Sequence, residues 1–166
     1  MKTEGFQTFL QGPAAETAGN RVHLVSPGKR HDTFLSDFIN EYQKRLSPFY
    51  DIEWHFPSAG DKEDEGKKIL GLLKDDDLVL LLDEDGKKCS TPYLANLLES
   101  AKNEGAKRLV IIIGGSYGVS EAVTSRANQS LSLSDLVLPH MLVRAIIIEQ
   151  LYRANSLLVG GKYHHE

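Results

Sequence analysis

Two short, uninterrupted aliphatic runs constrain the fold more than any other feature of the sequence. Leu78–Leu82 and Leu109–Ile113 contain only Leu, Val and Ile, with no alternation of polar side chains. Strands of this kind are buried on both faces, which is typical of a parallel sheet covered by helices on either side. Neither run is long enough to cross a bilayer.

Helix and strand patterns alternate around these two runs. Further strands are predicted at Val22–Ser26, at Asp51–Phe56 and at the strand-like end of Leu131–Leu138. Helices are predicted at Thr33–Leu46, Asp61–Lys74, Thr91–Gly105, Ser120–Asn128 and His140–Leu157, with Thr91 as the cap before Pro92. The alternation predicts an α/β fold with a mainly parallel sheet of about five strands and helices on both faces. Residues 1–21 are expected to form a loose N-terminal extension and residues 22–166 a single domain.

Three segments follow predicted strands and are expected to form the ligand site, because ligands of such folds bind beyond the carboxyl ends of the strands. They are Leu82–Gly86, Gly114–Gly118 and Leu136–His140. Asp83–Gly86 is predicted to be a turn. The segment Ser132–His140 offers main-chain donors and acceptors with apolar flanks, which would suit an adenine-like ring. The alternative is an ordinary turn between a strand and a helix, and from this segment alone the turn is favoured.

Composition excludes several classes of protein. A single cysteine, Cys89, excludes an intramolecular disulfide framework and a zinc ribbon, and it fits a reducing cytoplasm. The first twenty residues lack the pattern of a signal peptide. The formal net charge of -4 argues against a general nucleic-acid binder. The acidic excess lies entirely in the first half, so a small basic site remains compatible with the C-terminal half.

The sequence Gly114-Gly115-Ser116-Tyr117-Gly118 fits two interpretations. It matches the nucleophile elbow of a serine hydrolase, with Ser116 as nucleophile and Asp135 and His140 following in the required order. It equally fits a tight turn in which glycine permits a positive φ or a close backbone approach, and this second interpretation is favoured.

The last predicted helix contains Arg144 in an apolar setting. Arginine is rarely buried without a partner, so Arg144 is expected either to pair with a carboxylate such as Glu149 or to face an anionic ligand. The remaining apolar surface of the helix is core or a dimer interface. The chain ends with the neighbouring His164 and His165, which alone do not supply a closed metal site, so no metal is predicted.

Several motifs, taken together in order and spacing, resemble the RlmH (YbeA-like) family of SPOUT-class methyltransferases. They are Ile113–Gly118, Ser130–Ser134, Leu138-Pro139-His140, Val143-Arg144, Glu149–Ala154 and Tyr163–Glu166, with weaker matches at Leu82-Asp83, Gly86-Lys87 and Val25–Lys29. The resemblance covers about residues 22–166. One departure is His165, which stands where the family has Arg, so a permanent charge becomes a titratable one.

The resemblance implies a C-terminal trefoil knot and a homodimer in which the tail of one subunit completes the site of the other. It implies S-adenosylmethionine as the cofactor, held by loops of the knot. Carried over by motif, the cofactor-binding residues are Leu82, Gly115, Ser134, Asp135, Leu136, Val137, Leu138 and Pro139.

The implied reaction is methyl transfer to N3 of a pseudouridine in the 23S rRNA of assembled ribosomes, without metal or membrane. Within this frame His164 or His140 is the expected base, Arg144 is expected to hold the anionic imide or a phosphate, and Tyr163 is expected to stack on the target base. A module that binds S-adenosylmethionine or RNA without catalysis remains a further alternative.

Overall fold

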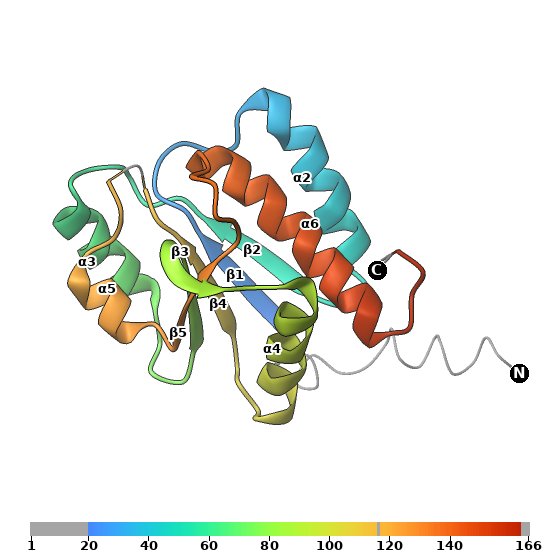
Figure 1. The fold of residues 1–166 in the computed structure, drawn as a ribbon. Helices are drawn as coiled ribbons and strands as arrows, with labels where there is room; N and C mark the ends of the chain where they lie inside the picture. Colours follow the sequence, from blue (N-terminus) through green and yellow to red (C-terminus); the bar gives the residue numbers. More distant parts are fainter. Residues whose placement is uncertain (1–19, 116, 164–166) are drawn as a thin grey trace, which may run out of the picture.

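The computed structural model describes residues 20–115 and 117–163, and Figure 1 shows them as one sheet between two layers of helices. The five strands are all parallel and lie in the order β2-β1-β4-β3-β5. Their bounds are β1 Arg21–Val25, β2 Asp51–His55, β3 Leu78–Lys88, β4 Leu109–Ile113 and β5 Gln129–Ser132. The predicted α/β fold with a parallel sheet is therefore confirmed.

The helices divide between the two faces of the sheet (Figure 1). They are α2 Thr33–Leu46, α3 Lys62–Leu72, α4 Thr91–Asn103, α5 Glu121–Arg126 and α6 His140–Leu158. Side chains of α2, α4 and α6 form the larger core, and α3 and α5 form a smaller core on the other face. Among the described residues, no helix combines the length and apolar character that crossing a membrane requires.

The N-terminus of α4 lies one residue from the prediction. Ser90, not Thr91, is the N-cap, and its hydroxyl oxygen accepts a hydrogen bond from the main-chain N–H of Tyr93 at 3.2 Å. The Thr91 hydroxyl donates instead to Oε1 of Gln150 in α6 at 2.6 Å. Thr91 therefore joins two helices of the larger core instead of capping its own helix.

The predicted turn at Asp83–Gly86 is wrong, because β3 continues to Lys88. Residues Leu80–Leu82 pair with β5, and after a register shift Lys87 and Lys88 pair with Leu131 and Ser132. A Cβ atom at Gly86 would lie 2.7 Å from main-chain atoms of Ser130 and Leu131. Long-range pairing with β5 thus outweighs the turn propensity of the acidic segment.

The predicted strand at Leu131–Leu138 ends at Ser132, so its Leu-Val-Leu end is also corrected. The Ser132 hydroxyl donates to the carbonyl of Ser134 at 2.9 Å, and the Ser134 hydroxyl oxygen accepts from the N–H of Leu136 at 2.9 Å. Such local bonds between side chain and main chain turn the backbone away from a sheet. Leu136 and Val137 are consequently 73% and 80% exposed.

Candidate functional site

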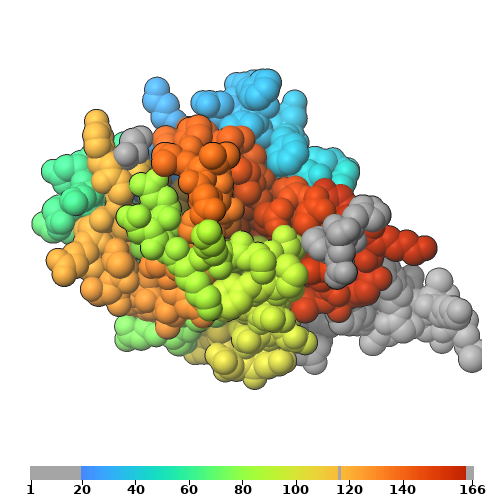
Figure 2. Space-filling model, viewed as in Figure 1, coloured from blue at the N-terminus to red at the C-terminus, as the bar shows by residue number. Residues whose placement is uncertain are grey.

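A cavity of about 770 Å³ lies beyond the carboxyl ends of β4 and β5 and beside the middle of β3, at Leu82, Asp83 and Glu84. It is lined by residues of all three segments predicted to form the ligand site, and this volume is in the usual range for small-molecule sites. The end of β3 and the segment before α6, coloured lime green and orange, lie side by side on the face shown in Figure 2.

Most of the residues expected to bind a cofactor line this cavity. They are Leu82, Gly115, Ser134, Leu136, Val137, Leu138 and Pro139. Asp135 is not among the lining residues, and its carboxylate pairs with the Lys88 ammonium group at 3.1 Å on the surface. The walls are completed by apolar side chains such as Ile113 and Val143, which suit a partly apolar ligand.

The loop from Ser134 to Pro139 leaves main-chain donors available. Within the described part of the chain, no hydrogen bond is made by the N–H groups of Val137 and Leu138. Main-chain groups of this kind are strong hydrogen-bonding groups, so they can bind a ligand that presents acceptors. The predicted recognition of an adenine-like ring by main-chain atoms stays a prediction.

The glycine segment after β4 is a tight turn, as the favoured interpretation predicted. The N–H of Gly118 donates to the carbonyl of Gly115 at 3.0 Å, and Gly118 has a φ of 83°. At Gly115 a Cβ atom would lie 2.5 Å from Oε1 of Glu65, a carboxylate that is itself buried and accepts a bond from Gly60. Glycine is therefore required here for a close approach and for a positive φ.

The described residues of the predicted triad, Asp135 and His140, do not support the hydrolase interpretation. Ser116 lies outside the described residues. The Asp135 carboxylate is committed to Lys88, and the two described residues Asp135 and His140 share no hydrogen bond. A Ser–His–Asp triad needs the acid to orient the histidine, so this pair does not form a triad.

Arg144 is completely buried near the start of α6. Its Nε donates to the Ser26 hydroxyl at 2.7 Å, and its two terminal nitrogens donate to the carbonyls of Lys29 at 2.8 Å and Pro27 at 3.3 Å. The guanidinium also lies over the Phe56 ring. Burial lowers the pKa of Arg144, although Asp32 opposes this shift.

The predicted pairing of Arg144 with Glu149 is wrong. Glu149 pairs with Arg153, one turn later in α6, at 2.6 Å. Arg144 instead fixes the loop that follows β1, because three of its donors reach that loop. Sequence reasoning missed this function, since its acceptors are main-chain carbonyls more than 100 positions away.

His140 is the predicted catalytic residue that the structure places in the cavity wall. It opens α6 and lies one turn before Arg144, so the two share a helix face. Burial, followed by the charge of Arg144, lowers the pKa of His140. The imidazole is therefore mainly neutral near pH 7 and able to accept a proton.

Tyr163 lies away from the cavity. Its hydroxyl group lies 2.6 Å from the Tyr42 hydroxyl oxygen and donates to Oε1 of Glu149 at 3.1 Å. Burial and these two hydrogen bonds raise the pKa of Tyr163. Glu149 is nine positions after His140, about 14 Å along the helix axis. The predicted catalytic residue His164, like His165, lies outside the described residues.

An apolar groove between α2 and α6 lies next to the cluster formed by Tyr42, Tyr163 and Glu149. It has a volume of about 510 Å³ and is lined by Phe34, Leu35, Phe38, Leu142, Ala145, Ile146, Glu149 and Gln150. Phe34 is 91% exposed, although it is one of the apolar residues that recur at helical spacing in α2. The sequence contains a signal for this exposed surface, because the apolar stripe of α2 is wider than one buried helix face needs.

Residues 21–164 match the protein family described as "Predicted SPOUT methyltransferase". The match covers nearly the whole chain, including every segment that lines the cavity. The chain therefore belongs to the SPOUT methyltransferase family, and it is an enzyme that transfers methyl groups.

Similar proteins carry a more particular name, "Ribosomal RNA large subunit methyltransferase H". The protein of this name from Parabacteroides distasonis is 36% identical over 156 residues, covering 88% of this chain and 99% of its own length. That from Clostridium botulinum strain Kyoto is 38% identical, covering 86% of this chain and 98% of its own. That from Bacteroides thetaiotaomicron is 40% identical over 138 residues and covers 83% of both chains.

Proposed function

We propose that this enzyme transfers a methyl group from S-adenosylmethionine to N3 of a pseudouridine in the 23S rRNA of assembled ribosomes. The observation that carries the proposal is the cavity beyond the carboxyl ends of β4 and β5 and beside the middle of β3, in a chain that belongs to this methyltransferase family. Its similarity to ribosomal RNA large subunit methyltransferases supports the choice of substrate.

The residues of the cavity fit S-adenosylmethionine. The free N–H groups of Val137 and Leu138 suit the acceptors of an adenine ring, and Leu82 and Ile113 supply apolar walls. Gly115 lines the cavity, and its lack of a side chain lets this turn pack closely against the buried carboxylate of Glu65. When bound, the cofactor supplies a methyl group on a sulfonium that already contains the leaving group.

The protein has to hold N3 of the base in line with the methyl group and to remove the N3 proton. Alignment alone contributes several kcal/mol to such reactions. His140 is a suitable base because it lines the cavity and its lowered pKa keeps it neutral. His164 is the second candidate base. In an RNA the target base would have to leave its stack to reach these groups.

Arg144 contributes to this site by positioning. Because its guanidinium is buried against Ser26, Pro27 and Lys29, it fixes the loop after β1 next to the start of α6. We therefore assign to Arg144 the placement of His140 and of this loop, in place of the predicted direct contact with an anionic imide or phosphate.

The proposal includes a homodimer. Tyr163 lies beside Glu149, about 14 Å along α6 from His140, and this separation supports a site that combines Tyr163 of one copy with the cavity of another. The groove with Phe34 and Phe38 offers the apolar surface on which that copy would dock. Tyr163 would then stack on the target base bound at the partner's cavity.

The proposal also includes the C-terminal knot. β5 pairs with β3 on both sides of the register shift, at Leu80–Leu82 and again at Lys87 and Lys88. Gly86 allows the two main chains to approach closely between these positions. In Figure 1 the connection from β3 to α4 crosses the segment that leads into α6. Both observations support a chain that passes through this loop before α6 begins, although knots are very rare.

An assembled ribosome as substrate agrees with the charge of the chain. The net charge of -4 is unfavourable for binding naked RNA. A folded ribosomal surface can be recognised by its shape and by a local patch, so we expect methylation of assembled ribosomes and little methylation of isolated 23S rRNA.

Labelled methyl transfer to ribosomes that lack the modification tests the reaction. Wild type is expected to incorporate label, and His140→Ala and His164→Ala are expected to reduce the rate by about 100-fold or more if each supplies acid–base chemistry. Cofactor binding without incorporation by the wild type would contradict the proposal and favour a non-catalytic binding module.

Mixing the two variants tests the composite site. In a mixed dimer one site has the intact cavity of one subunit and the intact tail of the other, so statistical mixing is expected to restore about a quarter of the wild-type activity. Sites built within one subunit would give no restoration.

A further inference from the structure

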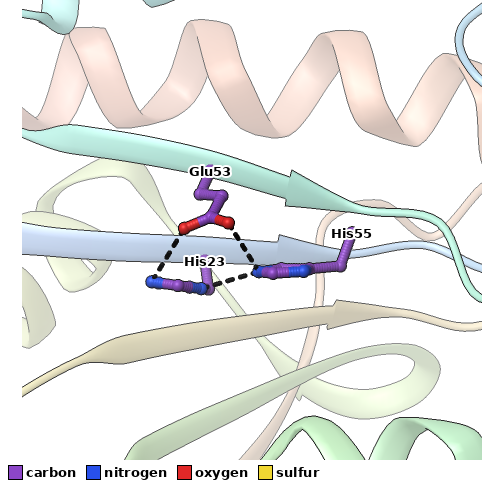
Figure 3. A group of neighbouring side chains, drawn as sticks. All are labelled: His23, Glu53 and His55. Carbon is purple, nitrogen blue, oxygen red and sulfur yellow. Dashed lines mark hydrogen bonds and ion pairs between the residues drawn. The ribbon is translucent and has the colours of Figure 1, made fainter.

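A cluster of two histidines and a glutamate lies on the opposite side of the sheet from α6. His23 is in β1, and Glu53 and His55 are in the neighbouring edge strand β2. Because side chains alternate along a strand and His23 is paired in register with Glu53, all three project from the same face. Figure 3 shows the three side chains pointing toward one another.

The distances place one ligand atom of each residue within 4.8 Å of the other two. Nδ1 of His23 lies 2.7 Å from Nε2 of His55, and the two rings stack with centroids 5.0 Å apart. The Glu53 carboxylate oxygens lie 3.7 Å from Nε2 of His23 and 3.8 Å from Nε2 of His55.

We propose that His23, Glu53 and His55 form a binding site for a divalent transition-metal ion of the zinc class. Imidazole nitrogen and carboxylate oxygen are preferred ligands of Zn²⁺, and two His with one Glu is a known three-ligand set that leaves one position open. Bonds of about 2.0–2.1 Å in a tetrahedral site separate neighbouring ligand atoms by about 3.3 Å. Nε2 of His55 lies 2.7 Å from Nδ1 of His23 and 3.8 Å from a Glu53 oxygen, and these values lie around the tetrahedral separation. One ligand atom of each residue lies within 4.8 Å of the others, so side-chain rotations can close the site.

The charges around the cluster are compatible with a cation. The Glu53 carboxylate lies within 4 Å of ring nitrogens of both histidines and supplies the negative charge that a cation site needs. Arg108 is paired with Asp77 through two hydrogen bonds of 2.8 and 2.6 Å. The positive charge of Arg108 is thereby compensated before it reaches the cluster.

The proposed site is independent of the methyltransferase cavity. Its three residues are absent from the cavity lining. An ion here would join the edge strand β2 to β1, and it would stabilise the folded state because the unfolded chain does not hold the three ligands together. The unfolding temperature should therefore rise with metal concentration, and a chelator should reverse the rise.

The test uses the untagged full-length chain, freed of metal by a chelator and titrated with Zn²⁺ in a calorimeter. We expect one site per chain, and Co²⁺ at the same site should give the visible absorption of a tetrahedral ion. His55→Ala is expected to weaken binding by about 100-fold or more and Glu53→Gln by about tenfold. Both side chains are partly exposed, at 25% and 60%, so these variants should fold.

The matched control is the double variant His164→Ala/His165→Ala, which removes the other neighbouring pair of histidines. It is expected to keep the site, its stoichiometry and its Co²⁺ spectrum. Binding that survives His55→Ala, or that disappears in the double variant, would overturn the proposal. So would the absence of Zn²⁺ binding to the wild-type chain, which would leave the cluster a hydrogen-bonded group in the sheet.

Discussion

The two ends of α6 each hold an arginine, and the two arginines have opposite environments. Arg144, near the start, is fully buried and donates to a hydroxyl and two main-chain carbonyls of a distant loop. Arg153, near the end, is partly exposed and pairs with Glu149 on its own helix. The first arginine fixes tertiary structure, whereas the second belongs to a polar cluster with Tyr163 at the surface.

This difference separates the part of α6 that anchors a distant loop from the part that carries polar groups at the surface. The buried part fixes the loop after β1. Between the two arginines and around Arg144, α6 also lines the apolar groove from Leu142 to Gln150, opposite the exposed Phe34 of α2. Variants that affect one end alone are therefore the sharpest way to test the assignment.

The largest effect is expected from Arg144→Met. Three buried acceptors would lose their donor, and such losses together cost about 3 kcal/mol or more in the free energy of unfolding. Arg153→Met is the matched control on the same helix and should cost less than about 1 kcal/mol, because exposed ion pairs contribute little. Urea unfolding of both variants measures the difference, and equal losses would contradict the proposed contrast.

Phe34→Glu tests the groove. Since Phe34 is 91% exposed, a charge there should leave the subunit folded, yet it would place an unpaired charge in the proposed interface. We expect monomers in sedimentation equilibrium and a loss of methyl transfer of about 100-fold, equivalent to about 2.7 kcal/mol. Lys44→Glu, an exposed change elsewhere on α2, should remain dimeric and active. A dimeric, active Phe34→Glu would exclude this interface.

Gly115→Ala tests the cavity with a smaller change. The added Cβ would lie 2.5 Å from Oε1 of Glu65, so the turn has to shift beside the cofactor site. Calorimetry is expected to show about tenfold weaker binding of S-adenosylmethionine, or about 1.4 kcal/mol. The control is Gly71→Ala in α3, where a Cβ meets no atom within 4 Å. Unchanged affinity in Gly115→Ala would place the cofactor elsewhere.

An effect of similar size concerns His31, which lies edge-on against Trp54 and Phe56 near Arg144. Burial, followed by the charges of Arg144 and Arg30, lowers the pKa of His31 from 6.5 to about 4. Between these pH values the unfolded chain binds a proton that the folded protein does not, so stability falls as the pH is lowered.

After allowance for partial exposure, this loss is about 1–2 kcal/mol. Urea unfolding at pH 7 and at pH 4.5 measures it. His31→Phe should show a smaller loss between the two pH values, and an unchanged loss would show that other groups are responsible.

The sequence predicted most of this fold because its signals are local. Aliphatic runs located the buried strands β3 and β4, and helical spacing placed α2 at its observed bounds. The convergence of three segments at one cavity followed from a general property of parallel sheets. The features that were missed depend on contacts between distant parts of the chain.

The extension of β3 through Gly86 depends on pairing with β5, and the exposed loop at Leu136 depends on serine bonds to the main chain. Arg144 finds its acceptors more than 100 positions earlier. The cluster of His23, Glu53 and His55 exists only because β1 and β2 pair in one particular register. No spacing within a single element would have indicated any of these contacts.

The bond between Arg144 and Ser26 also has a consequence for biosynthesis. It joins residues that are 118 positions apart, near opposite ends of the chain. During translation the loop after β1 has to wait for almost the entire chain before its arginine emerges from the ribosome. A chain that has not reached α6 therefore lacks the anchor of the loop after β1, and the cavity wall that α6 supplies is missing at the same time.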